Sequence, residues 1–172
     1  KDTRARNTHS STAIEGNPTE HAVAEPLDLA LVARLRTVVE QATRAFEAFD
    51  YAAALQVVEE SFWQFCDHYL ELVKLRSYAD DDTPGRRSAL ATLGLALGTY
   101  LRLLAPFMPY VTEEVWSWRF AGEGRARSVH TAPWPQPAEL DGVPGAAVEG
   151  TFEAAVEVMT KVRGAKTLAQ KS

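Results

Sequence analysis

The sequence has a single cysteine, Cys66, among its 172 residues, and this scarcity excludes a small fold held together by internal disulfide bonds. It also excludes a zinc site built from cysteines, and the four histidines lack the spacing of zinc ligands. We therefore predict no metal site. One unpaired cysteine is typical of a reducing cytoplasm, where we expect this protein to work.

Long apolar runs and an excess of basic residues are also missing. Nothing approaches the run of about 18 apolar residues that a membrane span needs, so we predict no contact with a membrane. The formal net charge is −5, which argues against strong nucleic-acid binding by the whole surface, because neutralisation of phosphates dominates such binding. An RNA-binding function would therefore require a local basic patch or help from other domains.

The first part of the chain changes from a polar segment to a helical pattern. Residues 1–25 are polar and lack a sustained apolar period, so we interpret them as a linker or tail. Pro26 is a favourable first-turn residue for a helix, and Asp50 is a suitable N-cap for the helix after it. Between them, apolar side chains recur with the spacing of one helical face. These are Leu31, Leu35, Val38, Val39, Ala42, Phe46 and Phe49.

The second predicted helix, after Asp50, carries the clearest periodic signal, an apolar stripe that continues for nearly five turns. Glu60, Asp67 and Glu71 lie opposite this stripe, and we interpret them as solvated or paired with basic groups. The stripe consists of Leu55, Val58, Phe62, Phe65, Cys66, Tyr69, Leu72 and Val73.

A third helix is predicted to begin at Pro84, with Asp82 or Thr83 as its cap. Gly94 and Gly98 lie four residues apart in it, and small residues at that spacing indicate that another helix passes close. We expect the buried face of this helix to consist of Leu90, Leu93, Leu97, Tyr100, Leu101 and Leu104.

The remaining segments are shorter. The pattern predicts a fourth helix over 112–118, a short extended strand over 128–131, a Pro/Trp segment over 133–137, and a last helix over 148–163. Together these elements predict an all-α fold, a bundle of four to five helices over 26–172 with a short extended Pro/Trp segment.

No pattern in the sequence predicts a catalytic site. It has no glycine-rich phosphate loop after a strand and no Gly-x-Ser-x-Gly or His-Glu-x-x-His motif. Cys66 belongs to the apolar stripe, where we expect a buried core thiol rather than an exposed nucleophile. Asp67 and His68 flank the stripe and are interpreted as solvated or salt-bridged. We therefore assign no catalytic residue.

Basic residues gather near the loop between the second and third predicted helices. Lys74 and Arg76 close the second helix, and Arg86 and Arg87 fall in the first turn of the third, where the helix dipole disfavours cations. Solubility alone would explain them, whereas a phosphate-binding patch would explain both the clustering and the unfavourable position. Trp63, at the edge of the apolar stripe, is a candidate for stacking on a base.

Four segments resemble the anticodon-binding domain of valyl-tRNA synthetases, which are class I aminoacyl-tRNA synthetases. The run FWQFCDHYLELVK at 62–74 is similar to the signature of this family, and AFDYAAAL at 48–55 is similar to its lead-in. LLAPFMPYVTEEVW at 103–116 also occurs in isoleucyl relatives. SVH at 128–130 and PWP at 133–135 resemble the segment after that helix. The segments follow the family's order over about 27–163.

The resemblance implies recognition rather than chemistry. In the family this bundle engages the anticodon arm of a valine-accepting tRNA, while a catalytic domain of the same polypeptide uses ATP and Mg²⁺. The His-Ile-Gly-His and Lys-Met-Ser-Lys-Ser signatures of that catalytic domain are absent here. Many family members also have histidine where Ala105 stands. The candidate tRNA-binding residues are Trp63, Lys74, Arg76, Arg86 and Arg87.

Two functions agree with these observations. The chain is either the tRNA-recognition part of a longer valine–tRNA ligase or a free-standing synthetase-like bundle that serves as a non-catalytic protein-interaction module. Residues 1–25, which match no segment of the family, and the acidic ridge on the second helix favour the second alternative.

Overall fold

The computed structural model describes residues 23–122, 126–141 and 148–169, and these residues form helices and no strand. The all-α fold class is therefore confirmed. None of the helices in this part of the chain is both long and apolar enough to cross a bilayer. The α-helices are α1 (Pro26–Glu47), α2 (Tyr51–Gln64), α3 (Leu70–Ser77), α4 (Pro84–Leu104), α5 (Pro109–Arg119) and α6 (Thr151–Ala169).

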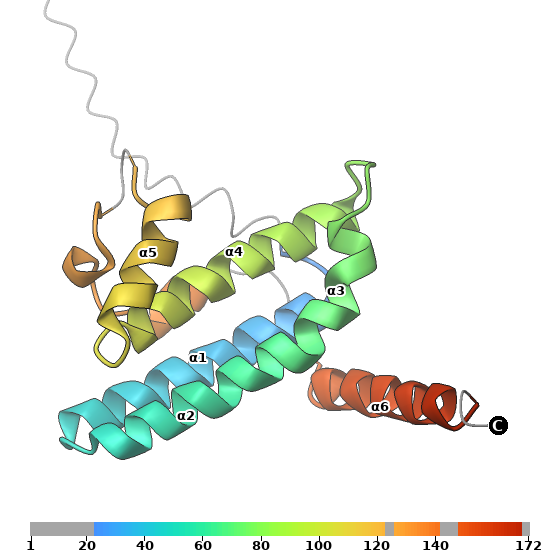
Figure 1. Cartoon of the computed structure of the whole chain (residues 1–172), viewed down its shortest axis with the longest axis horizontal. Coiled ribbons are helices and arrows are strands. Elements are labelled where there is room, and N and C mark those ends of the chain that lie inside the picture. The colour runs from blue at the N-terminus through green and yellow to red at the C-terminus, as the bar shows by residue number, and fades with distance from the viewer. Residues whose placement is uncertain (1–22, 123–125, 142–147, 170–172) are drawn as a thin grey trace, which may run out of the picture.

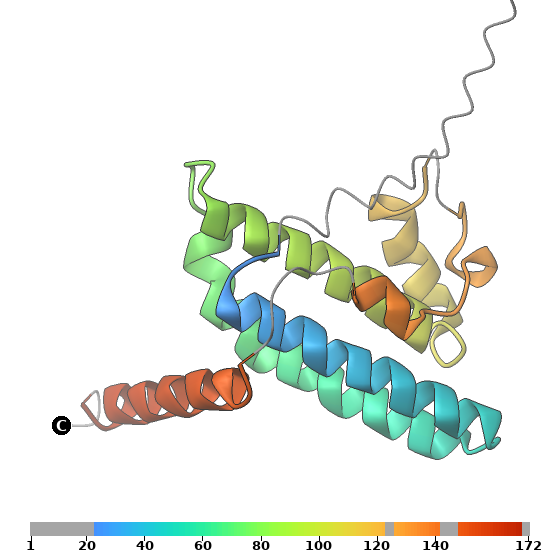
Figure 2. The same cartoon turned by 180° about the vertical axis from the view of Figure 1, so that it is seen from behind.

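Helices α1 and α2 form an antiparallel pair that runs the length of the bundle (Figures 1 and 2). Asp50 caps α2 as predicted, because its Oδ1 atom accepts a hydrogen bond from the backbone N–H of Ala53 at 3.0 Å. The prediction that Phe49 continues the buried face of α1 was wrong. Phe49 is 78% exposed, because α1 ends at Glu47 and the chain turns at Phe49 with φ of 60°.

Helices α2 and α3 are continuous through a π-helical turn at Phe65–Tyr69. They form one rod, so the described residues hold five helical rods, within the predicted four to five. The apolar stripe continues through the turn, where the buried rings of Phe65 and Tyr69 stack with centroids 5.7 Å apart. The wider turn brings the hydroxyl of Tyr69 onto the buried Asp28 of α1, at 2.8 Å.

Helix α4 packs across α1 and α2 and closes the main core. Leu90 was predicted to be buried, and this was wrong, because its side chain is 42% exposed. The helix instead turns the small side chains of Ser88, Ala89 and Thr92 inward, where all three are fully buried. Small inward side chains allow α4 to approach its neighbours closely.

A smaller core joins α4 to α5 and the segment after it. Its buried members are Leu101, Ala105, Trp116, Phe120 and Val129. Of the two tryptophans of α5, Trp116 is buried and Trp118 is exposed.

The segment after α5 contains two 3₁₀ turns, Val129–Thr131 and Pro137–Leu140. The strand predicted over 128–131 was therefore wrong, because the Ser128 side chain caps a turn by accepting from the backbone N–H of His130. Trp134 folds back onto the bundle and donates from Nε1 to Oγ1 of Thr43 at 2.9 Å.

The two ends of the described chain differ in how they contact the bundle. The predicted tail over 1–25 lies outside the described residues except for 23–25. Of these, Val23 is fully buried, and the backbone N–H groups of Ala24 and Glu25 donate to Ser88 Oγ of α4 at 3.0 and 3.1 Å. Helix α6 projects away from the bundle (Figures 1 and 2), and its buried anchor is Phe152 in its first turn.

Candidate nucleic-acid interface

The candidate basic residues lie where α3 meets α4, at the end of the bundle where α1 begins (Figure 1). Lys74 and Arg76 are in the last turn of α3, and Arg86 and Arg87 are in the first turn of α4. The Thr83 side chain fixes the start of α4, because its Oγ1 atom accepts a hydrogen bond from the backbone N–H of Arg86 at 3.1 Å.

Arg76 is held inward rather than presented to solvent. Its Nη1 and Nη2 atoms donate to the carboxylate of Asp28 at 2.8 and 2.7 Å, and Nη1 also donates to the carbonyl of Gly85 at 3.1 Å. Burial by itself lowers the pKa of the Arg76 guanidinium, but the hydrogen bonds and charge of Asp28 outweigh it, so the pKa is raised. Arg76 therefore ties α3 to α1 and to the first turn of α4.

Asp28 is the centre of this junction. Its side chain is fully buried, and it accepts hydrogen bonds from Tyr69 Oη at 2.8 Å and Ser88 Oγ at 2.5 Å in addition to those from Arg76. Charge and burial explain the arrangement, since a buried carboxylate requires a partner of opposite charge and further donors. The pKa of Tyr69 is raised first by burial and then by the charge of Asp28.

Of the other three cations of the junction, Lys74 and Arg87 are exposed and Arg86 is half-buried. Lys74 Nζ lies 3.5 Å from Glu71 Oε1, and Arg87 Nη1 lies 2.9 Å from Asp82 Oδ2, both pairs at the surface. Arg86 has no carboxylate within 4 Å among the residues described, and its Nε atom is buried without a hydrogen-bond partner. Arg86 is therefore the cation of this junction with the least local neutralisation.

Acidic side chains also lie at the junction. Asp80, Asp81 and Asp82 in the loop before α4 are exposed beside the four cations. The junction therefore alternates charges and does not form a uniform positive patch, so phosphate binding there depends on individual side chains.

Trp63 lies apart from the basic residues. Its side chain is 55% exposed, as expected for the edge of the stripe, and its Nε1 atom donates to Glu59 at a long 3.4 Å. Thirteen residues separate it from Arg76, which corresponds to about 20 Å along a helix. The structure therefore does not bring Trp63 together with the α3–α4 junction.

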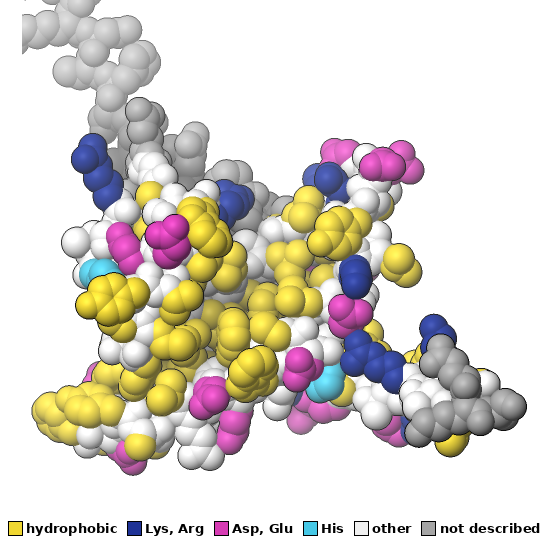
Figure 3. Space-filling view, in the orientation of Figure 1, with side chains coloured by type: hydrophobic (Ala, Val, Ile, Leu, Met, Phe, Trp, Pro, Cys, Tyr) yellow, Lys and Arg dark blue, Asp and Glu magenta, His cyan; other side chains and the backbone are white. Residues whose placement is uncertain are grey.

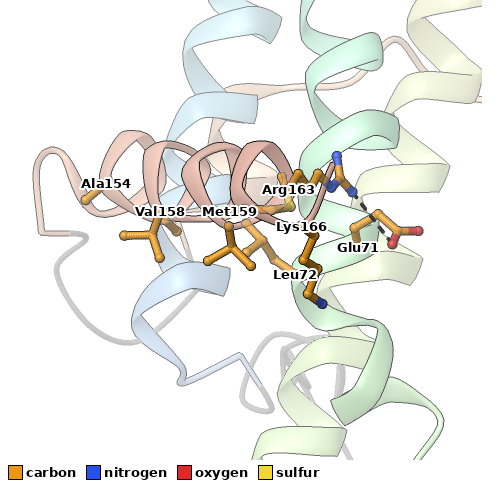
Figure 4. Close-up of a pocket in the computed structure, with 9 residues that line it drawn as sticks. Glu71, Leu72, Ala154, Val158, Met159, Arg163 and Lys166 are labelled. Atoms are coloured by element: carbon orange, nitrogen blue, oxygen red, sulfur yellow. Dashed lines mark ion pairs between the residues drawn. The ribbon is translucent and has the colours of Figure 1, made fainter. Parts of the chain in front are cut away.

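A second group of cations, which the sequence analysis missed, lies on α6. Arg163 reaches back to α3, where Nη2 lies 3.7 Å from Glu71 Oε2 and Nη1 lies 3.5 Å from the carbonyl oxygen of Asp67 (Figure 4). Lys166 lines the same groove between α3 and α6. The signal that could have identified them is the second half of the last helix, where Lys161, Arg163 and Lys166 occur without an acidic residue after Glu157.

The residues that could suggest acid–base or nucleophilic chemistry are not arranged for it. Cys66 is half-buried against the main core, and its thiol pKa is raised by burial and then by the charge of Asp67. Asp67 is exposed, and His68 Nδ1 is buried without a partner. In the described ranges no group of three or more His, Cys, Asp or Glu side chains is placed to hold a metal ion.

A model of the family described as the anticodon-binding domain of tRNA ligase matches residues 28–172, which includes the junction, the α3–α6 groove and nearly all of α1. The chain belongs to this family. The four segments that resembled the synthetases lie within or next to the helices that build the anticodon-binding domain.

Its relatives include several valine–tRNA ligases. That of Bifidobacterium longum subsp. infantis is 50% identical over 138 residues, which cover 75% of this chain and 15% of the relative. The ligase of Salinispora arenicola is 47% identical over 165 residues, 87% of this chain and 19% of the relative. The ligase of Thermobifida fusca is 46% identical over 151 residues, 88% of this chain and 16% of the relative. The chain thus spans 15% to 19% of the length of these three relatives.

Proposed function

We propose that residues 26–172 bind the anticodon arm of a valine-accepting tRNA as one part of a valine–tRNA ligase. The observation that carries this proposal is the family match over 28–172 together with 46% to 50% identity to ligases of this specificity. The activation of valine with ATP and Mg²⁺ then belongs to a catalytic domain of the same polypeptide. No step of that reaction is assigned to these helices, and the cytoplasm is the compartment where this work is expected.

The accessible cations of the α3–α4 junction are the proposed phosphate ligands. Exposed pairs such as Lys74 with Glu71 contribute little to stability, about 0–1 kcal/mol, so a phosphate can replace the carboxylate at low cost. Arg86 already lacks an acidic partner within 4 Å among the described residues. Arg76 has another function in this proposal, because its guanidinium is used by Asp28 and it positions the junction instead of binding phosphate.

Trp63 is proposed to act separately, as a stacking surface for an unpaired base. Its exposed indole could lie against a nucleotide other than those whose phosphates meet the junction, because the two lie about 20 Å apart along the helix. Base stacking on an aromatic side chain contributes about 1–3 kcal/mol. Trp63→Ala should therefore weaken RNA binding without changing the salt dependence of the association constant.

A direct binding measurement tests the proposed function. We expect the 172-residue chain to bind a valine-accepting tRNA more tightly than a tRNA for another amino acid, with affinity falling as salt rises. Reversal of both Arg86 and Arg87 to Glu should lower the association constant at least about tenfold and reduce the salt slope by about 1.4 to 1.8. The control is reversal of Arg44 and Arg119 to Glu, which makes the same change of net charge on exposed residues far from the junction.

Equal affinity for both tRNAs, and equal effects of the two double reversals, would refute this proposal. The non-catalytic protein-interaction module would then be the better interpretation. Figure 3 favours that alternative in one respect, because hydrophobic side chains gather over the middle of the face shown there, between α2 and α4. An apolar surface of this kind is typical of contact with another protein domain. In the ligase proposal that partner is the catalytic domain of the same polypeptide.

A further inference from the structure

The groove between α3 and α6 has an apolar floor and cations at its mouth (Figure 4). The groove has a volume of about 630 Å³. Its floor is formed by Leu72 of α3 with Val158, Met159 and Val162 of α6. Such a surface can hold a flat apolar group beside an anion.

Cations outnumber carboxylates at the mouth of the groove among the described residues. Glu71, which lines the groove, is shared by two cations: Arg163, also in the lining, with Nη2 at 3.7 Å, and Lys74, next to the groove, with Nζ at 3.5 Å. Lys166 lines the groove and has no carboxylate within 4 Å among the residues that the structure describes. Lys74 and Arg163 therefore share the carboxylate of Glu71, and Lys166 is a further cation of the same groove, in a chain whose net charge is −5.

The existing ion pairs leave these cations available. All three side chains of the shared group are about half exposed, with 45% for Glu71, 56% for Lys74 and 50% for Arg163. The Lys74 hydrogen bond to Glu71 is long, at 3.5 Å, and the Arg163 contact at 3.7 Å is longer than a hydrogen bond. Exposed pairs of this kind are weak and are screened by salt. Arg76, by contrast, is bound to Asp28 through two short hydrogen bonds and is not available.

We propose that the α3–α6 groove binds one nucleotide of an RNA strand, with Lys74, Arg163 and Lys166 around a phosphate and the apolar floor against the base. This inference rests on the proposed function and extends the RNA-binding surface from the junction across α3 to α6. Figure 3 supports the continuity, since basic side chains lie over the start of α4, over α3 and over α6 on one face. Charge favours RNA over an apolar peptide as the occupant, because each nucleotide carries a phosphate that requires cations.

The experiment measures binding of the 172-residue chain to the anticodon stem-loop RNA of a valine-accepting tRNA by fluorescence anisotropy at several salt concentrations. Lys166→Glu should lower the association constant about tenfold in low salt and reduce the salt slope by about 0.7 to 0.9, which corresponds to one phosphate contact. The matched control is Lys161→Glu, on the same helix with the same change of charge but outside the groove lining. It should change affinity less than about twofold.

Glu71→Gln tests the proposal through the direction in which it changes the association constant for RNA. A carboxylate that only fixes α6 to α3 through Arg163 would, when removed, leave RNA binding unchanged or weaker. A carboxylate that competes with phosphate for Lys74 and Arg163 would, when removed, raise the association constant about threefold. Circular dichroism would verify that each variant retains its helical content.

The outcomes separate this inference from the proposed function. If the unaltered chain does not bind the stem-loop, both fail. If it binds and is weakened by reversal of Arg86 and Arg87, while Lys166→Glu behaves like Lys161→Glu, only the groove inference is overturned. It is also overturned if Glu71→Gln leaves binding unchanged or weakens it, because the groove would then be a structural contact or a binding site for a protein segment. Weaker binding with Lys166→Glu and tighter binding with Glu71→Gln would support it.

Discussion

Asp28→Asn should destabilise the bundle by about 3 kcal/mol through the loss of a buried charge partner. Asp28 accepts four hydrogen bonds of 2.5 to 2.8 Å, from Tyr69, Ser88 and both Nη atoms of Arg76. Asparagine keeps the shape but replaces one acceptor oxygen with a donor and removes the charge. Removing one partner of a buried ion pair costs about 3–5 kcal/mol, and the Arg76 side chain, 25% exposed, recovers some hydration, which favours the lower value.

Urea denaturation followed by circular dichroism measures this loss, and a double-mutant cycle assigns it to the pair. Arg76→Met leaves the fully buried carboxylate of Asp28 with Tyr69 and Ser88 as its donors among the residues described, so we expect a loss of about 3–5 kcal/mol. The double variant removes both charges and should lose about 2–3 kcal/mol less than the sum of the single changes. Additivity within about 0.5 kcal/mol would refute the reasoning.

A second ion pair in the chain provides the control. Arg102 binds Glu139 through two hydrogen bonds of 3.1 and 2.8 Å, in the same two-pronged geometry. The Glu139 side chain is 39% exposed, whereas Asp28 is fully buried. Glu139→Gln should therefore cost about 1 kcal/mol, because water already screens the exposed Glu139 carboxylate and the Arg102 guanidinium keeps its hydrogen bonds to the carbonyl oxygens of Gly98 and Pro133. If both substitutions cost the same, burial is not the cause of the effect at Asp28.

Two further predictions concern α4, one about its glycines and one about the buried phenol of Tyr100. Gly94→Ala should stabilise the protein by up to about 1 kcal/mol, because alanine favours helix and, apart from the adjacent residues and the backbone of α4 itself, no atom of the described residues lies within 4 Å of the added Cβ. Gly98→Ala should give no gain, because its Cβ would meet the ring of Phe120 at 3.2 and 3.3 Å. Thermal denaturation of both variants tests this difference. Burial raises the pKa of Tyr100 to about 12. The stability that its neutral phenol contributes is therefore complete below about pH 10, and about 3 kcal/mol of it is lost as pH rises through about 12. Denaturation measured across this range should show a smaller loss for Tyr100→Phe than for the unaltered chain.

Helix starts could be predicted from the sequence because they depend on nearby residues. Pro26 and Pro84 occupy first turns, and Asp50 and Thr83 cap the following helices with their side chains. Each of these signals acts within about four residues, so it is readable in one sequence. The family segments are likewise runs of adjacent residues, so they could be recognised in one sequence.

The partners of the basic residues could not be predicted, because they depend on contacts between distant segments. Arg76 meets a carboxylate 48 residues earlier in the chain, and Arg163 meets the backbone of Asp67, 96 residues away. Arg76 and Arg86 look alike in the sequence, as cations beside one loop. The first is bound inside the junction, and the second keeps no acidic partner within 4 Å among the described residues. A list of cations near a loop therefore overestimates how many can bind phosphate.

The net charge of −5 is a weaker objection to RNA binding once the charges are placed. Asp28 is buried and paired, so it neutralises Arg76 inside the protein rather than repelling a phosphate at the surface. The acidic loop of Asp80, Asp81 and Asp82 does lie beside the junction, and it should repel an RNA backbone there. Among the described residues, fewer carboxylates lie beside the cations of the α3–α6 groove than beside those of the junction. If RNA follows the surface with the lower electrostatic cost, its contacts should shift from the start of α4 toward α6, and substitutions at Lys166 should then weaken binding at least as much as those at Arg87.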